Sequence, residues 1–159
     1  MQRRHFLAIG AALGGLLALH RSAQSASAAN DRKWDLSDDE WRKRLTAEQF
    51  QVLRQEGTER AGSSALNGEK RKGMFVCAGC ELPLFKSETK YESGTGWPSF
   101  FDFIPGSLGT KTDYKIVYPR TEYHCIRCGG HQGHVFDDGP KPTGKRYCNN
   151  GVALKFMPG

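Results

Sequence analysis

The chain has 159 residues, of which 38% are hydrophobic and 19 are glycines, and its formal net charge is +6. This length suits one domain with a modest core, and the composition favours a loop-rich, mainly β fold over a helical bundle. The charge is too small to indicate nucleic acid binding, because Arg3, Arg4 and Arg21 lie in an N-terminal segment that we expect to be removed.

Residues 1–28 have the features of an export signal. Arg3 and Arg4 precede an apolar run at 6–19, which is too short to span a bilayer comfortably, and A-S-A at 26–28 has the form of a cleavage site. The sequence R-R-H-F-L resembles the twin-arginine export motif, whose pathway carries folded proteins. An ordinary secretory signal or an uncleaved anchor is the alternative. We expect a periplasmic protein with a flexible linker at 29–33 and no stable membrane association after cleavage.

Two short helices are expected at the start of the domain, which we assign to residues 34–157. Ser37 with Glu40 and Thr46 with Gln49 have capping-box spacing, and Gly57 is expected to end the second helix. A charged loop follows over 57–73. Strands are expected at the aromatic and β-branched segments 74–76, 83–85, 97–103, 113–118, 121–124, 134–136, 146–150 and 152–156.

Two Cys-x-x-Cys pairs, separated by 44 residues, predict a metal site built from Cys77, Cys80, Cys125 and Cys128. Four thiolates form the tetrahedral ligand set of structural zinc, with no position left for substrate. Gly79 and Gly129 are expected to permit the tight turns. Two disulfides, or iron in place of zinc, are the alternatives. A single zinc would staple two halves of the fold in place of core that a small domain lacks.

The fifth cysteine, Cys148, belongs to neither Cys-x-x-Cys pair and so has no partner. A buried core cysteine and a nucleophile are both compatible with its position. Arg146, two residues earlier, would share its strand face and could stabilise a thiolate. His131 and His134 follow the second Cys-x-x-Cys pair, so their positions are fixed by it, although structural roles or a second metal are alternatives. Trp97 could line an apolar pocket beside the thiol or belong to the core.

Four segments together resemble one family: C-A-G-C-E-L-P-L-F, S-G-T-G-W-P-S-F, T-E-Y-H-C-I-R-C-G-G-H-Q-G-H-V-F-D-D-G-P and P-T-G-K-R-Y-C-N-N-G-V-A-L-K-F. They are similar to the type B peptide-methionine sulfoxide reductases, which reduce the R epimer of methionine sulfoxide. The resemblance covers about residues 34–157. It implies two antiparallel sheets with a zinc site far from the active site. It also implies Cys148 as the nucleophile, Trp97 against the substrate methyl group, and three residues around the sulfoxide oxygen, namely His131, His134 and Asn150.

The sequence departs from the family pattern at two positions. Thr95 stands where many relatives carry a resolving cysteine, and Asn149 stands where an apolar residue is usual. With four cysteines assigned to zinc, we expect a single-cysteine cycle. In this cycle the sulfenic acid of Cys148 is reduced by a small thiol or a thioredoxin-like partner. A non-enzymatic zinc-ribbon binding module and a thiol peroxidase remain the alternative functions.

Overall fold

The computed structural model describes residues 33–159, and residues 34–159 form one compact unit. The predicted export signal and nearly all of the predicted linker lie outside the described residues. Within the described part of the chain, no helix has both the length and the hydrophobicity needed to cross a membrane.

Both predicted helices are present, α2 (Asp38–Arg44) and α3 (Ala47–Leu53), and both begin with the predicted capping box. In each box the N-cap side chain accepts a hydrogen bond from the backbone of the third helical residue, whose own side chain accepts from the N-cap backbone. Helix α3 ends at Leu53, so the predicted end at Gly57 is wrong. Glu56 has a φ of 55°, and this left-handed residue turns the chain away before Gly57 is reached.

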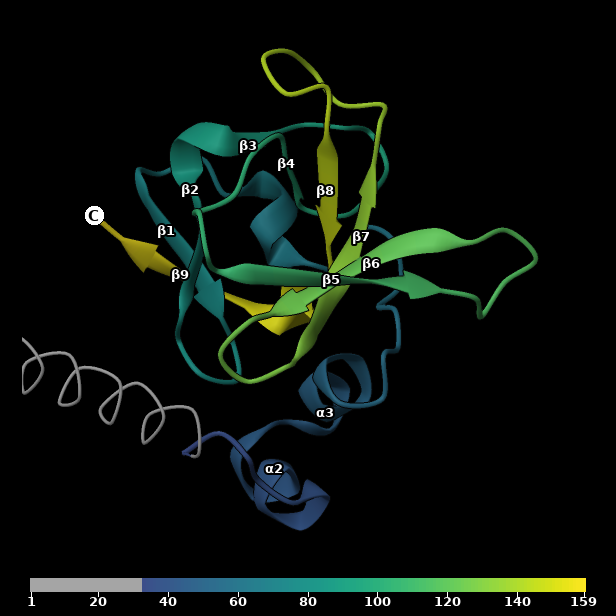
Figure 1. The fold of residues 1–159 in the computed structure, drawn as a ribbon. Coiled ribbons are helices and arrows are strands. Elements are labelled where there is room, and N and C mark those ends of the chain that lie inside the picture. The colour runs from purple at the N-terminus through teal and green to yellow at the C-terminus, as the bar shows by residue number, and fades with distance from the viewer. Residues whose placement is uncertain (1–32) are drawn as a thin grey trace, which may run out of the picture. The chain divides into compact units, whose positions relative to one another are not determined.

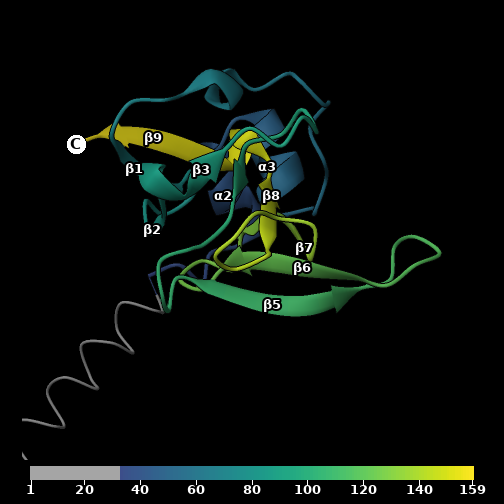
Figure 2. The same cartoon turned by 90° about the horizontal axis from the view of Figure 1, so that it is seen from above.

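The rest of the chain forms two antiparallel sheets, as predicted (Figures 1 and 2). The small sheet has the order β2-β1-β9 and the large sheet the order β3-β4-β8-β7-β6-β5. The strands are β1 (Gly73–Cys77), β2 (Pro83–Lys86), β3 (Lys90–Tyr91), β4 (Ser99–Phe100), β5 (Leu108–Asp113), β6 (Arg120–Cys125), β7 (His131–Phe136), β8 (Arg146–Asn149) and β9 (Leu154–Pro158). Three short 3₁₀ helices complete the fold, at Ala65–Gly68 (η1), Ser87–Thr89 (η2) and Gly151–Ala153 (η3).

The predicted strand at 113–118 is wrong. The strand β5 ends at Asp113, and residues 114–119 form the loop of a hairpin that projects from the large sheet (Figure 1). The Asp113 carboxylate accepts a hydrogen bond from the backbone of Lys115, which is the side-chain turn that Asp favours at a strand end. The apolar side chains that suggested a strand are exposed instead, with Val117 at 91% exposure.

Two other predicted strands differ from their expected bounds, one by being shorter and the other by being shifted along the chain. Only Ser99–Phe100 of the segment 97–103 pairs as a strand, and β9 begins at Leu154 because Gly151–Ala153 forms η3. The capping interaction of η3 comes from the charged loop, where the Glu59 carboxylate accepts hydrogen bonds from the backbones of Gly151 and Val152 at 2.6 and 2.9 Å.

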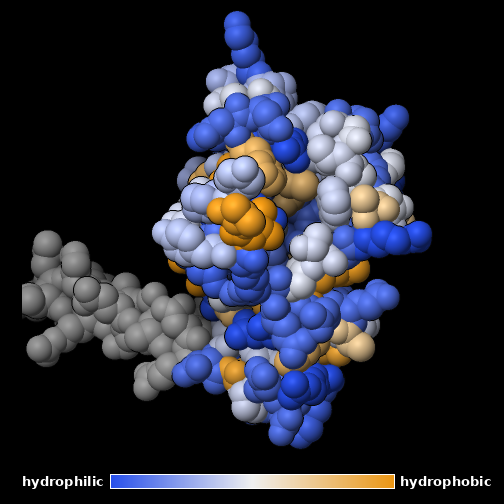
Figure 3. Space-filling view, turned by 90° about the vertical axis from the view of Figure 1, so that its right-hand side faces the viewer, coloured by the Kyte–Doolittle hydropathy of each residue, from blue (hydrophilic) through white to orange (hydrophobic). Residues whose placement is uncertain are grey.

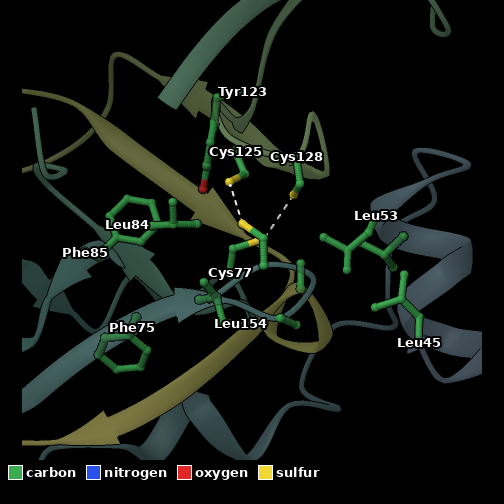
Figure 4. Close-up of a cluster of buried hydrophobic side chains, with 14 of the residues drawn as sticks. Leu45, Leu53, Phe75, Cys77, Leu84, Phe85, Tyr123, Cys125, Cys128 and Leu154 are labelled. Carbon is green, nitrogen blue, oxygen red and sulfur yellow. Dashed lines mark hydrogen bonds between the residues drawn. The ribbon is translucent and has the colours of Figure 1, made fainter. Parts of the chain in front are cut away.

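An aromatic core lies between the two sheets. Phe85 of the small sheet stacks on Phe100 of the large sheet with ring centroids 4.1 Å apart, and Tyr123 meets the edge of Phe85. These side chains are fully buried, and Figure 4 shows Phe85 and Tyr123 in the same buried cluster as the cysteine side chains. The core therefore holds β4, β6 and β8 in fixed positions, and these strands carry residues of the site.

Candidate active site and metal centre

The four cysteines of the two Cys-x-x-Cys pairs, hereafter the cysteine cluster, converge as predicted. Cys77 ends β1 and Cys125 ends β6, and the tight turn after each strand brings Cys80 and Cys128 to the same place (Figure 4). All four side chains are buried, with exposures of 0% to 7%.

The two turns use different left-handed residues. In the second turn Gly129 has a φ of 67°, and its N–H donates to the Cys125 carbonyl, as a glycine there permits. In the first turn the equivalent residue is Glu81, with a φ of 60°, and its N–H donates to the Cys77 carbonyl. Gly79, which we expected to permit the first turn, does not itself have a positive φ.

The geometry of the cysteine cluster fits a tetrahedral metal ion. All four sulfurs lie within 4.8 Å of one another, with 3.6 Å between Cys77 and Cys128 and 3.5 Å between Cys80 and Cys125. A tetrahedron with metal–sulfur bonds of about 2.3 Å has edges of about 3.8 Å. All five cysteines of the chain are free, and hydrogen bonding within the cluster, with burial, raises the pKa of Cys77 well above its usual range. The cluster could hold a metal ion, whose charge would favour the thiolate form of these cysteines.

Cys148 lies elsewhere, near the middle of the large sheet. The register places it directly opposite His134 on β7 and opposite Ser99 on β4. Directly opposed residues of antiparallel strands point to the same face. The row continues to Glu122 beyond His134 and to Tyr91 beyond Ser99. One face of the sheet thus carries a thiol flanked by a histidine and a hydroxyl.

A cavity of about 120 Å³ opens at this face. It brings together four predicted site residues, since Trp97, His134, Cys148 and Asn150 all line it. The other lining residues are Thr58, Arg120, Gly133, Phe136 and Asn149. None of the cysteine cluster lines the cavity. His131 and Arg146, also predicted for the site, are not part of its wall.

The surroundings of Cys148 have opposing effects on the pKa of its thiol. Burial raises the pKa of the thiol, while the positive charge of Arg146 and hydrogen bonds from Thr95 and Arg146 oppose that rise. Arg146 is itself held by Asp138, to which its Nε and one terminal nitrogen each donate at 2.8 Å. The predicted proximity of Arg146 to the thiol is thus present, although Arg146 reaches Cys148 from outside the cavity.

His134 is oriented by a carboxylate. Its Nε2 lies 2.8 Å from Asp113 Oδ2, and Arg120 donates to the same oxygen at 2.6 Å. The pKa of Asp113 is held well below its usual range, chiefly by the hydrogen bond from the Lys115 backbone. Burial lowers the pKa of His134, and the Asp113 hydrogen bond opposes this shift. A neutral His134 that donates from Nε2 leaves Nδ1 as a proton acceptor.

His131 sits behind His134 with its ring centroid 5.5 Å away. It is 3% exposed, and its Nδ1 lies 2.8 Å from Glu122 Oε1, which is part of a buried carboxylate. Burial lowers the pKa of His131. Its Nε2 is buried and has no hydrogen-bond partner within residues 33–159.

The predicted loop over 57–73 positions two of the cavity residues through Glu59. The Glu59 carbonyl accepts a hydrogen bond from the Trp97 indole at 3.2 Å, and its backbone N–H donates to the Asn150 side chain at 3.0 Å. The Asn150 amide nitrogen donates to the Gln132 carbonyl at 3.0 Å. The loop therefore forms one side of the site.

The surroundings of Asn149 explain how a polar side chain fits where the family usually has an apolar residue. Strand alternation turns Cys148 toward the cavity and the Asn149 side chain toward the core, where it is fully buried. Its oxygen accepts from the Tyr123 hydroxyl at 2.9 Å, and its nitrogen donates to the Asn150 carbonyl and the Gln132 side chain. Gln132 in turn donates to the Cys77 sulfur at 3.4 Å. This network connects the cysteine cluster to the strand that carries Cys148.

The sequence analysis missed Glu59, Asp113 and Asn149 as positioning residues. Glu59 lies in a charged loop that resembled a solvated segment, and Asp113 was placed at the start of a strand that does not form. A single carboxylate in such a stretch has no partner residue at a characteristic spacing, so the sequence does not indicate its role. Asn149 was visible only as an unusual polar residue beside Cys148.

This arrangement defines a β protein with a buried four-cysteine centre and one free thiol in a histidine-lined cavity. A SelR domain family model matches residues 45–158. "Peptide methionine sulfoxide reductase MsrB" of Methanosarcina barkeri is 55% identical over 121 residues, covering 76% of this chain and 85% of that protein. The protein of the same name from Leptospira interrogans is 53% identical over 122 residues, covering 76% and 93%.

A plant protein, "Peptide methionine sulfoxide reductase B1, chloroplastic" of Arabidopsis thaliana, is 53% identical over 122 residues. The chain spans only 60% of that protein's length. The chain belongs to the SelR-domain family of type B peptide methionine sulfoxide reductases, which are oxidoreductases. This membership favours an enzyme over the zinc-ribbon binding module that the cysteine pairs alone left open.

Proposed function

We propose that this protein reduces the R epimer of methionine sulfoxide in peptides and proteins, with Cys148 as the nucleophile. The observation that carries the proposal is the cavity that joins the free thiol of Cys148 with His134, Asn150 and Trp97. The Trp97 ring offers an apolar wall for the methyl group, and the polar side chains face the position of the sulfoxide oxygen. Family membership supports the same reaction.

The reaction needs a proton on the sulfoxide oxygen as sulfur is attacked. Because burial raises the pKa of Cys148 and lowers that of His134, the available proton resides on the thiol at neutral pH. His134 Nδ1 can accept this proton and pass it to the oxygen, while Asp113 stabilises the charge that forms on the imidazole. The amide of Asn150 can orient the oxygen by hydrogen bonding.

The chemistry is a transfer of oxygen between two sulfurs. The Cys148 sulfur attacks the sulfoxide sulfur, a sulfur–sulfur bond forms, and the sulfoxide oxygen takes a proton. The sulfur–oxygen bond of the substrate then breaks as the oxygen becomes bonded to the Cys148 sulfur, and cleavage of the sulfur–sulfur bond releases methionine and leaves Cys148 as a sulfenic acid. No other cysteine of the chain lies outside the cysteine cluster. We therefore propose a single-cysteine cycle in which an external thiol or a thioredoxin-like protein reduces the sulfenic acid.

The surface beside the cavity favours a polypeptide substrate. Arg120 lines the cavity and pairs with Asp113 at the base of the projecting hairpin, whose loop exposes Tyr114, Ile116, Val117 and Tyr118 by 50% to 91%. Figure 3 views the molecule from the side toward which the hairpin projects and shows hydrophobic residues gathered on a largely hydrophilic surface. An apolar loop whose base borders the cavity suits residues that flank an oxidised methionine.

We propose zinc as the ion of the cysteine cluster, held by Cys77, Cys80, Cys125 and Cys128. Four buried thiolates at tetrahedral spacing suit zinc, and a closed site of this kind contributes folding free energy without touching substrate. We also propose export through the twin-arginine signal in residues 1–28, since that pathway would carry the chain already folded around its metal.

Stereospecific reduction of a synthetic peptide tests the function. With dithiothreitol as reductant, the protein should convert a peptide containing R-methionine sulfoxide to the methionine form and leave the S epimer unchanged. Equal rates on the two epimers would contradict the proposed role of Trp97 and the polar wall. Turnover of hydrogen peroxide in the absence of any sulfoxide, without sulfoxide reduction, would instead identify a thiol peroxidase.

A further inference from the structure

A second cavity, hereafter the Tyr91 pocket, adjoins Cys148 without including it. Its volume is about 380 Å³, and its wall is formed by Tyr91, Glu92, Ser93, Thr95, Asp138, Gly139, Pro140 and Arg146. Arg146 lies two residues before Cys148 on β8, and both Thr95 and Arg146 oppose the rise of the Cys148 pKa that burial causes, so two side chains of this wall act on the thiol. The substrate cavity and the Tyr91 pocket share no lining residue.

The two cavities lie toward opposite ends of the same strand pair. On β8 the substrate cavity contacts residues 148–150, whereas the Tyr91 pocket contacts Arg146. On β7 and the chain that follows it, the substrate cavity contacts residues 133, 134 and 136, whereas the Tyr91 pocket contacts 138–140. Phe136 pairs with Arg146, so the two cavities meet at this row, with the substrate cavity on its β7 side and the Tyr91 pocket on its β8 side. Cys148 therefore has the substrate cavity on one side and the Tyr91 pocket on the other.

The Tyr91 pocket has hydrogen-bonding groups available to a ligand. The Tyr91 hydroxyl is buried and has no hydrogen-bond partner in the described part of the chain. A chain of hydroxyls also runs along the pocket, with 2.9 Å between Ser93 and Thr95 and 2.7 Å between Ser93 and Ser99. Because each hydroxyl can donate or accept a hydrogen bond, these hydroxyls can reorient when the charge of the Cys148 sulfur changes.

The pocket also has a defined charge. Glu92 and Asp138 contribute two carboxylates and Arg146 one guanidinium, which is already paired with Asp138. The Glu92 carboxylate accepts a hydrogen bond from the backbone of Gly94 and has no cationic partner among the ion pairs of residues 33–159. The pocket is therefore net negative, and an anionic ligand would approach it less readily than a neutral or cationic one.

We propose that the Tyr91 pocket admits the small thiol that reduces the sulfenic acid of Cys148, and that it selects uncharged or cationic thiols over thiols bearing carboxylates. The inference rests on the proposed function, since that reaction creates the sulfenic acid. Displacement at sulfur proceeds in line, so a thiol must approach from the side opposite the sulfenic oxygen. With the oxygen left beside His134 and Asn150, that side is the Tyr91 pocket.

The reduction balances with two thiols. The first thiolate attacks the Cys148 sulfur, a sulfur–sulfur bond forms, and the sulfenic oxygen leaves as hydroxide, which takes a proton to become water. A second thiol attacks the mixed disulfide, releases the Cys148 thiol and leaves as the oxidised external disulfide. Two thiols are oxidised and one sulfenic acid is reduced.

The experiment separates oxygen transfer from recycling. The protein is mixed with one equivalent of R-sulfoxide peptide without reductant, and the methionine formed is counted. The sulfenic protein is then mixed with cysteamine, 2-mercaptoethanol or 3-mercaptopropionate, and rate constants are compared per thiolate. We expect cysteamine to react faster than 3-mercaptopropionate. This ratio should fall about threefold in Glu92→Gln and about tenfold in Glu92→Lys, because a single charge near the path changes association rates by such factors.

Two further variants sharpen the test. Glu88→Gln removes a carboxylate of η2 that does not line the Tyr91 pocket, so its thiol ratio should equal that of the unmodified protein. Tyr91→Phe removes only a hydroxyl, and we expect about a threefold slower reaction with 2-mercaptoethanol but not with ethanethiol. The first step should be unchanged in all these variants.

The outcomes distinguish the two proposals. No methionine in the first step contradicts the proposed function itself. A full equivalent of methionine, followed by thiol ratios that are the same in the unmodified protein, Glu92→Gln and Glu92→Lys, overturns the role of the Tyr91 pocket. Ratios that change equally in Glu88→Gln would also overturn it, because the effect would then come from the overall charge of the protein.

Discussion

The cysteine cluster and Cys148 carry the same side chain in two different surroundings. The four cluster sulfurs are at most 7% exposed and face one another, whereas Cys148 is half-buried and faces a cavity with a histidine opposite. The comparison teaches that the function of a thiol is set by its neighbours. Sulfurs that surround one point form a closed metal site, and a sulfur with an open side and a proton acceptor is suited to reaction.

Removing a cluster cysteine should have the largest effect. Cys128→Ser leaves three buried thiolates around an incomplete metal site, and structural zinc contributes on the order of 10 kcal/mol or more to folding. We expect loss of metal together with loss of the cooperative thermal transition, measured by elemental analysis and circular dichroism. A metal-free Cys128→Ser protein with an unchanged melting temperature would show that the cluster does not stabilise the fold.

Removing the lone thiol should affect activity alone. Cys148→Ser exchanges one half-buried atom, so the metal content should stay the same and the melting temperature should change by only a few degrees. Sulfoxide reduction should fall to the background rate, because a hydroxyl does not form the sulfenic acid. Residual stoichiometric methionine formation in this variant would place the nucleophile elsewhere.

The contact between the two regions can be broken at Asn149. Asn149→Ala removes the partner of the Tyr123 hydroxyl and of the Gln132 side-chain oxygen in the core, and we expect about 3 kcal/mol of destabilisation in denaturant unfolding. Tyr123→Phe, which removes one hydroxyl from the same network, serves as the control and should cost about 1 kcal/mol. Equal stability of Asn149→Ala and the unmodified protein would rule out a structural role for the network.

The surroundings of Cys148 can be altered through Asp113. His134 must be neutral to accept the thiol proton, so the rate should fall as the pH drops through the His134 pKa. Asp113 raises that pKa, and its loss lowers the pKa further. In Asp113→Asn the acidic limb of the pH–kcat profile should therefore move to lower pH, with kcat reduced about tenfold because the imidazolium loses its counter-charge. An unmoved limb would show that His134 does not carry the proton.

The smallest effect is expected at the hairpin loop. Val117→Ser should lower kcat/KM about threefold for an apolar peptide substrate and leave free methionine sulfoxide unaffected, because the loop lies outside the cavity. Ile126→Ser, at an exposed residue of the second cysteine turn, is the matched control. If both variants reduce the peptide rate equally, the hairpin has no specific role in substrate binding.

Local sequence rules predicted the parts of the fold that depend on neighbouring residues. The capping boxes and the convergence of the cysteine pairs follow from short spacings, and they are present as predicted. The prediction of a strand at 113–118 was wrong because it depended on the β-branched and aromatic composition of the segment, which does not indicate where the hairpin turns. The predicted end of α3 was wrong for a similar reason, since Glu56 adopts a conformation that sequence rules reserve for glycine, as Glu81 does in the first cysteine turn.

By itself, the sequence determined the four cysteines that could hold a metal ion, the family and the candidate nucleophile, because each depends on residue types at fixed spacing. The tertiary structure alone decided which side chains surround that nucleophile. Strand register placed His134 and Ser99 opposite Cys148, a distant loop brought Glu59 to Trp97 and Asn150, and the approach of segments 91–95 and 138–140 formed the Tyr91 pocket. These contacts join segments far apart in the chain, and the energy of packing, which no local pattern encodes, selects them.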